Sequence, residues 1–147
     1  YLIVVGSFVS ASAFAGESGH SHMSAGNTTD DRTELKLPAP LKVKQKAMMR
    51  KHLGTVGELT GLVAEGDLKG AGKMARQRLG WTPVEAEQCS KVSKMSGEDD
   101  FMTFGMALHK QADAFADAAE KGDASAALSE LSLLIVKCNA CHERFRH

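Results

Sequence analysis

The sequence predicts an all-α fold and, within that class, an up-down-up-down four-helix bundle. Apolar residues recur at the three- and four-residue spacing of amphipathic helices along most of the chain after residue 40. Pro38, Pro40 and Pro83, the three prolines of the chain, all fall outside these periodic stretches. Two short connections, at residues 65–67 and 121–123, join consecutive stretches. Since such short links join antiparallel neighbours, helix count and loop length together predict the bundle.

The first two helices are expected from about Leu41 to Ala64 and from Asp67 to Leu79. In the connection between them, Gly66 is the expected C-terminal cap and Asp67 the N-cap of the next helix, because glycine and aspartate favour these positions. The connection at 121–123 offers Gly122 and Asp123 for the same two roles. One face of the first helix has the spacing that a core-facing helix requires. The residues on this face are Met48, His52, Val56, Leu59 and Val63.

Residues 80–95 are expected to link the two helical hairpins and to contain a short helix. Thr82 is its predicted N-cap, Pro83 its first residue and Glu85 the capping-box partner. The third long helix is expected from Ser96 to Lys121. Its apolar seam consists of Phe101, Phe104, Leu108, Ala112, Phe115 and Ala119.

The fourth long helix, from Asp123 to about Arg146, contains the segment Cys138-Asn139-Ala140-Cys141-His142. C-x-x-C-H is the sequence to which c-type haem is attached. Two thiols at this spacing form thioether bonds to the two vinyl groups of one porphyrin, and the adjacent imidazole becomes an axial iron ligand. A zinc site usually needs four N or S ligands, whereas a redox dithiol is expected in a βαβ context. The motif therefore predicts one covalent haem c, with its iron bound by His142.

The haem motif continues an apolar seam of the fourth helix. Leu128, Leu131, Ile135, Cys138 and His142 follow 3-4-3-4 spacing on one face. We therefore expect the haem to pack into the bundle and not onto its outside. The low aromatic content, 5%, agrees with this, because a core of small and aliphatic side chains can be filled at its centre by one large flat group.

The N-terminal region differs in composition from the rest. Residues 1–15 are mostly apolar and end in an A-x-A cleavage site, which predicts a signal peptide; a transmembrane anchor would need about 20 apolar residues. Residues 16–40 are expected to form a disordered or extended linker, and residues 41–147 the four-helix domain. The linker contains His20, His22 and Met23, which are either a copper site or incidental polar residues.

The charge balance excludes two classes of partner. The formal net charge is zero, so neither a nucleic-acid partner nor an electrostatic membrane patch is expected. After removal of a signal peptide, no membrane anchor is expected either.

Residues 41–147 resemble the cytochrome c-prime family, including its low-spin relatives. The segment 138–146 is similar to the family's C-x-A-C-H motif followed by an aromatic residue and an arginine, and the segment 44–48 is similar to its Arg-Gln-x-x-Met pattern. The resemblance implies that Arg146 lies close to the haem and its proximal histidine. It further implies that Lys44, where the family usually has arginine, and Gln45 lie near the haem propionates, and that Met48 faces the distal side of the iron.

The sixth coordination position of the iron would decide the chemistry. Some family members place a thioether there and carry electrons, while others leave the position empty and bind nitric oxide or carbon monoxide. Met48 is the expected sixth ligand, opposite His142, with Met49, His52, His109 or no ligand as alternatives. The resemblance implies an electron carrier exported to the periplasm, and a five-coordinate gas-binding cytochrome is the alternative.

Three further expectations complete the sequence analysis. An enzymatic role such as a peroxidase is not expected, because no distal His–Arg pair is clearly placed for peroxide cleavage. Cys89 is interpreted as a buried free thiol or as half of an intermolecular disulfide. The resemblance implies a homodimer packed through the first two helices, whereas the redox partner protein cannot be identified from the sequence. Close approach on the first helix is favoured by Gly54, Gly57 and Gly61.

Overall fold

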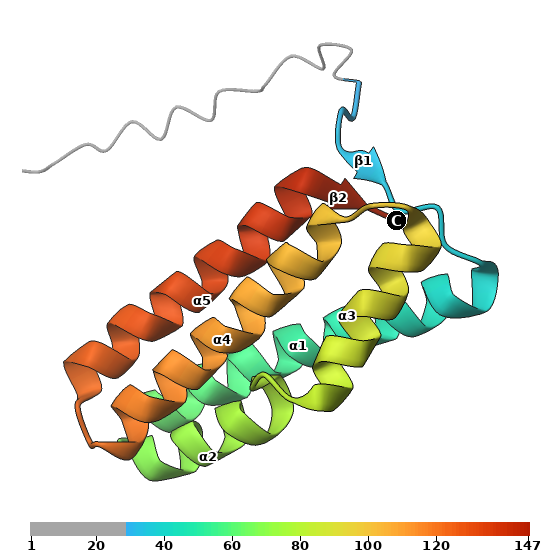
Figure 1. Cartoon of the computed structure of the whole chain (residues 1–147). Coiled ribbons are helices and arrows are strands. Elements are labelled where there is room, and N and C mark those ends of the chain that lie inside the picture. The colour runs from blue at the N-terminus through green and yellow to red at the C-terminus, as the bar shows by residue number, and fades with distance from the viewer. Residues whose placement is uncertain (1–28) are drawn as a thin grey trace, which may run out of the picture. The chain divides into compact units, whose positions relative to one another are not determined.

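The computed structural model describes residues 29–147, in which Asp31–His147 form a compact unit. The predicted signal peptide and the residues His20, His22 and Met23 lie outside the described residues. The all-α fold is confirmed, because the described part is predominantly helical. Its elements are β1 (Thr33–Glu34), α1 (Ala39–Ala64), α2 (Leu68–Leu79), α3 (Pro83–Ser96), α4 (Asp100–Glu120), α5 (Ala124–Arg144) and β2 (Phe145–Arg146) (Figure 1).

The two short interhelical connections have the predicted caps. The Asp67 side chain accepts a hydrogen bond from the Gly70 amide at 2.9 Å, and the Asp123 side chain accepts one from Ala126 at the same distance. Gly66 and Gly122, with φ of 81° and 78°, occupy the left-handed region that favours glycine. These local interactions stop one helix and start the next within three residues.

The connecting helix α3 is longer than expected. It begins as predicted, with Pro83 as its first residue and the Thr82 hydroxyl accepting a hydrogen bond from the Glu85 amide at 3.2 Å. The whole helix is 14 residues long and ends at Ser96. Its C-cap is Gly97, which has a φ of 76° and donates its N–H to the Ser93 carbonyl. The prediction that a third long helix starts at Ser96 was therefore wrong, because Gly97 terminates α3 there and α4 begins at Asp100.

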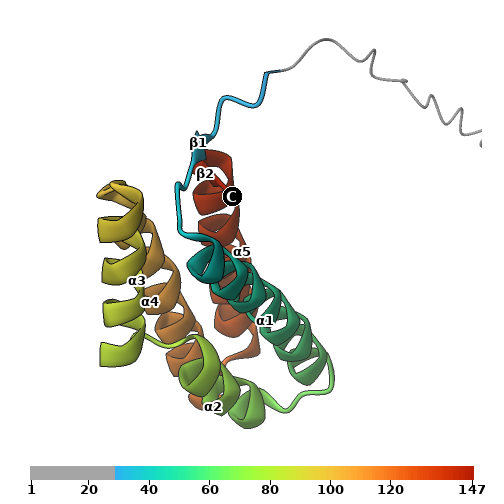
Figure 2. The same cartoon turned by 90° about the vertical axis from the view of Figure 1, so that its right-hand side faces the viewer.

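Helix α4 is the central element of the packing. α2 and α3 lie one after the other alongside it (Figures 1 and 2) and run antiparallel to it. Arg76 of α2 binds Asp117 near the end of α4 at 2.7 Å, whereas Cys89 of α3 lies directly against Gly105 in its first half. α5 packs along another side of α4, while α1 packs mainly against α2 and has sparser contacts with α5.

The buried face of α5 differs from the predicted seam by one position. Ala127, Leu131 and Leu134 are buried, whereas Leu128 is 54% exposed and Ile135 is 43% exposed. The expected place of Leu128 in the seam was therefore wrong, whereas Ile135, although not buried, lines the same cavity as Cys138 and His142. The seam is set by the contact with α4, and its 4-3-4 spacing continues into Cys138, which packs against the same core.

The segment before α1 is extended but packed. β1 pairs in parallel with β2, so that Thr33 lies opposite Phe145, and the Leu35 amide donates a hydrogen bond to the Arg146 carbonyl at 2.8 Å. Leu35 is only 1% exposed and packs with Phe145. The compact unit thus begins at Asp31 rather than at residue 41, because this segment is fixed by the C-terminus.

By length and composition, α5 is the one helix among residues 29–147 that could cross a membrane. It contains Glu130 and Lys137, and its Ala127, Leu131 and Leu134 pack in the core. Because a helix in the core of a soluble protein meets the same criteria, this finding is weak evidence for a membrane span.

Candidate cofactor site

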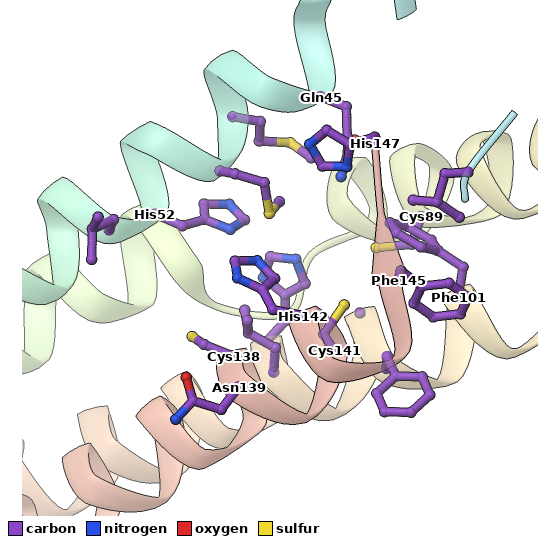
Figure 3. A pocket seen from close by; sticks show the side chains of 18 of the residues that line it. Gln45, His52, Cys89, Phe101, Cys138, Asn139, Cys141, His142, Phe145 and His147 are labelled. Atoms are coloured by element: carbon purple, nitrogen blue, oxygen red, sulfur yellow. The ribbon is translucent and has the colours of Figure 1, made fainter. Parts of the chain in front are cut away.

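A cavity of about 370 Å³ lies among α1, α3, α4 and α5, at the end of the helices nearest the β1–β2 pair. This volume lies in the range of small-molecule and cofactor sites. The lining is mostly apolar and aromatic. It includes both cysteines and the histidine of the C-x-x-C-H motif on one wall and His52 on another (Figure 3). Met48 and Met49, on the same helix as His52, also line the cavity.

The two motif cysteines lie on the wall formed by α5. Both are half-buried free thiols, and no disulfide joins them. Burial raises the pKa of Cys138 and, together with the neighbouring Cys138, raises the pKa of Cys141 to about 11. At neutral pH both thiols are therefore protonated.

His142 follows directly on the same wall. Its ring points into the space between α5 and α1 (Figure 3), and its side chain is among those that line the cavity. Its backbone carbonyl accepts a hydrogen bond from Arg32 Nη1 at 3.3 Å. The last turn of α5 thus presents two thiols and one imidazole to a single cavity.

Helix α1 forms the opposite wall. Met48 and His52 lie one turn apart on it, and both line the cavity together with Gln45. Gln45 is only 1% exposed, and its Oε1 has no hydrogen-bond partner. The ring of His52 points from α1 toward the ring of His142 on α5 (Figure 3). The structure therefore brings the expected distal candidates and the expected proximal ligand to opposite sides of the same space.

Two of the predicted site residues do not line the cavity. Lys44 is exposed, and its Nζ donates a hydrogen bond to Gln88 Oε1 at 3.1 Å. Arg146 extends toward Glu34, with Nη2 at 3.7 Å from Oε2. Both are therefore directed to neighbouring polar side chains and not into the site.

The cavity also contains residues that sequence reasoning did not assign to it. His147 lies beside Gln45 (Figure 3), and burial, followed by the nearby charge of Lys46, lowers its pKa. Phe145 also lines the cavity. The family-like motif includes Phe145 as its aromatic residue, but sequence reasoning assigned neither residue to the site, because the backbone pairing of β2 with β1 holds this terminal segment in place. Cys89, expected to be a buried thiol, is free and lines the cavity, and burial raises its pKa to about 11.

His109 is a fixed part of the cavity wall. It is 2% exposed, and its Nδ1 lies 2.7 Å from the Leu79 carbonyl, which requires Nδ1 to carry the proton and donate it. Its Nε2 lies 3.6 Å from Glu85 Oε2. Since both ring nitrogens face protein groups, His109 is not arranged to bind a metal.

The donor set fits a cofactor that brings its own equatorial ligands. Within residues 29–147, no three His, Cys, Asp or Glu side chains gather closely enough to hold a metal ion by themselves. One imidazole and one thioether on opposite walls of an apolar cavity instead match the axial ligands of a haem iron. Gln45 Oε1 and His52 Nδ1, in two of the residues that line the cavity, are buried and have no hydrogen-bond partner within the described residues.

The chain matches no known protein-family model, no curated protein and no solved structure. The residues of the cavity themselves define it as a candidate c-type haem site in an all-α protein.

Proposed function

We propose that the protein is a monohaem c-type cytochrome that carries electrons in the periplasm. Its helices then form an up-down-up-down four-helix bundle like that of the cytochrome c-prime family, in which α2 and α3 share one position. The haem is attached through Cys138 and Cys141, with His142 as proximal ligand and Met48 as distal ligand. The observation that carries this proposal is the placement of the C-x-x-C-H motif opposite a methionine-bearing wall of one apolar cavity.

Each group in the cavity has a role in this function. Cys138 and Cys141 would hold the haem through two thioether bonds, each formed by addition of one S–H across one vinyl group, with no leaving group. A haem held in this way exchanges one electron between its ferric and ferrous forms. Phe145 contacts Phe101 and Phe104 at ring-centroid distances of 5.7 and 5.6 Å, and these rings exclude water from one side. Met48 contributes a neutral thioether, which raises the reduction potential.

The propionate side is assigned to Gln45. Its amide is buried at the cavity wall, and a half-turn of the amide exchanges Oε1 for the Nε2 donor that a carboxylate needs. Lys44 and Arg146 would first have to leave Gln88 and Glu34 to reach the haem. We therefore propose for these two cations at most a supporting role at the edge of the site.

The second candidate function is binding of a small gas at a five-coordinate iron. One observation favours it: Leu53 and Ile135 line the cavity and are 74% and 43% exposed, so the cavity opens to solvent at that edge. A diatomic molecule could enter there. The two functions differ in whether Met48 binds the iron or only covers it.

Absorption spectra of the purified holoprotein, oxidised and reduced, with and without carbon monoxide, test the proposal. A far-red methionine–iron band in the oxidised form and no change with carbon monoxide are expected of the electron carrier. A high-spin spectrum that shifts with the gas would instead support the gas-binding function. A purified chain without covalent haem, after expression with a haem-attachment system, would contradict both.

We also propose a homodimer that uses the exposed face of α1. Added Cβ atoms at Gly54, Gly57 and Gly61 meet nothing within 4 Å, so this face is open to a second copy. Sedimentation equilibrium of the holoprotein is expected to give twice the chain mass, and the mass of one chain at all concentrations would contradict the dimer.

A further inference from the structure

Two histidines line the distal part of the cavity, and their surroundings differ. His109 is held at Nδ1, which donates a hydrogen bond to the Leu79 carbonyl at 2.7 Å, and its Nε2 faces Glu85 Oε2 at 3.6 Å. His52 packs its ring edge against that of His109, with centroids 5.5 Å apart and an interplanar angle of 89°. Unlike His109, His52 has a buried ring nitrogen, Nδ1, with no hydrogen-bond partner.

An unpartnered buried nitrogen is costly. Leaving such a group unsatisfied destabilises the folded chain, so a partner for it in the working protein would be favourable. Burial, followed by the proximity of His109, lowers the pKa of His52 to about 4. The ring is therefore neutral at pH 7 and has one lone pair, which is the form of histidine that binds metals.

The position of His52 matches that of a distal ligand. It follows Met48 by four residues on α1, so both side chains lie on one helix face, and both line the cavity. Its ring points toward that of His142 on the opposite wall (Figure 3). Either side chain thus approaches the haem from the distal side.

We propose that His52 is a second distal ligand, which competes with Met48 for the sixth position of the iron. This inference rests on the proposed haem function. A thioether is a soft ligand and an imidazole a harder one, so Met48 binds preferentially in the reduced state and His52 gains in the oxidised state. The exchange breaks one iron–sulfur bond and forms one iron–nitrogen bond, with no further reactant.

The competition has a functional consequence. If Met48 is lost or oxidised, His52 still closes the sixth position, so the haem does not become an open gas-binding site. The apparent affinity for carbon monoxide then falls with the fraction of molecules whose iron is free. The distal side of α1 therefore selects electron transfer over gas binding through two ligands rather than one.

The test compares M48L, H52L and the double variant M48L/H52L with the wild type, and uses M74L as a matched control. Met74 lies on α2 against the alanine-rich core and does not line the cavity. Haem content per chain is measured first, as the pyridine haemochrome. If the wild type holds no covalent haem, the proposed function itself has failed; if it does, the spectra of the variants decide the role of His52.

In M48L we expect a low-spin ferric iron with the spectrum of two imidazole ligands and without the far-red methionine band. In M48L/H52L we expect a high-spin iron, and an apparent affinity of the reduced protein for carbon monoxide at least about tenfold above that of M48L. M74L should resemble the wild type. A high-spin M48L, indistinguishable from the double variant, would overturn the proposal.

H52L provides a second test of His52 as a distal ligand if M48L does not fold or incorporate haem. Electron paramagnetic resonance of the oxidised wild type should then show two low-spin species, of which H52L retains only the methionine-ligated one. Identical spectra of wild type and H52L would overturn the proposal.

Discussion

The two ends of the helical unit are packed in opposite ways. At the alanine-rich end, the helices approach closely through small residues that are completely buried, and an added Cβ at Gly72 of α2 would lie 3.0 Å from the Ala116 carbonyl of α4. At the pocket end, around Met48, His52 and Cys141, the helices leave a cavity of about 370 Å³. The small residues of the first end are Ala71, Ala75, Ala112, Ala116, Ala119 and Ala127.

This difference separates folding from function. Protein interiors are close-packed, so a cavity of this size beside a tightly packed region is a site shaped for another group. The alanine-rich end supplies helix packing that needs no cofactor, whereas the pocket end would gain stability from binding of the proposed haem. Four predictions test this division, from the largest expected effect to the smallest.

Removal of the attachment thiols should affect the pocket end and leave the alanine-rich end unchanged. The variant C138S/C141S is expected to lose all covalent haem, because both thioether bonds require these sulfurs. Amide hydrogen exchange should then show faster exchange in α3 and in the first half of α1, while α4 near Phe115 stays protected. Haem staining of a denaturing gel checks the first outcome. C89S is the matched control and should retain its haem.

Truncation of an aromatic side chain should lower the free energy of unfolding more at the alanine-rich end than at the pocket end. Phe115 is 0% exposed in the main core, so F115A is expected to lower the free energy of unfolding by about 3–5 kcal/mol. Phe104 is only half-buried and faces the cavity, so F104A should cost less in the haem-free C138S/C141S background. Urea denaturation of both variants in that background measures the difference. Equal losses would show that the two ends are not distinct.

Replacing glycine by alanine should change the free energy of unfolding in opposite directions in α2 and α1. G72A places its Cβ 2.8 Å from Glu120 Cγ and 3.0 Å from the Ala116 carbonyl, and such overpacking costs about 1–3 kcal/mol. G57A, in the exposed face of α1, meets nothing within 4 Å in the single chain, and at concentrations too low for the proposed dimer it should stabilise that chain by about 0.5–1 kcal/mol. Thermal unfolding of both variants tests this, and a stabilised G72A would disprove the close approach.

The pocket end should make the haem-free chain sensitive to acid. His52 has a pKa of about 4 in the folded chain and 6.5 as its ordinary value, so the unfolded state binds more protons between these limits. Its contribution to stability is therefore full above pH 6.5 and is lost as the pH falls toward 4. The stability difference between C138S/C141S and C138S/C141S/H52Q, followed by urea denaturation across this range, should shrink with falling pH. A constant difference would contradict the burial of His52.

Local sequence was sufficient to predict the helices but not which of their faces are buried. The caps at Asp67, Thr82 and Asp123 were predictable because each depends on residues within one helical turn. The burial of Ala127 and Leu134 in place of Leu128 and Ile135 was not, since both sets have helical spacing and only the position of α4 distinguishes them. The length of α3 was likewise underestimated, because its packing against α4 was not visible in a polar sequence.

The candidate site shows the same division. The motif residues Cys138, Cys141 and His142 and the opposing Met48 could be named from the sequence, and all line one cavity. The cavity position of His147 could not, because it follows from the pairing of β2 with β1, whose residues are over a hundred positions apart in the chain. Lys44 and Arg146 were named but turn to Gln88 and Glu34, partners that no spacing rule identifies.

By itself, the sequence determined the all-α class, the helix limits set by their caps, and the haem motif, because each depends on neighbouring residues. The tertiary structure alone decided which seam of α5 is buried, which residues join the motif in the cavity, and which distal histidine keeps a free nitrogen. Nothing in the sequence distinguishes His52 from His109 as a ligand. In the structure they differ because the Leu79 carbonyl binds a ring nitrogen of His109. The physical reason is that burial and hydrogen-bond pairing depend on elements far apart in the chain, whose approach is fixed only when the helices pack.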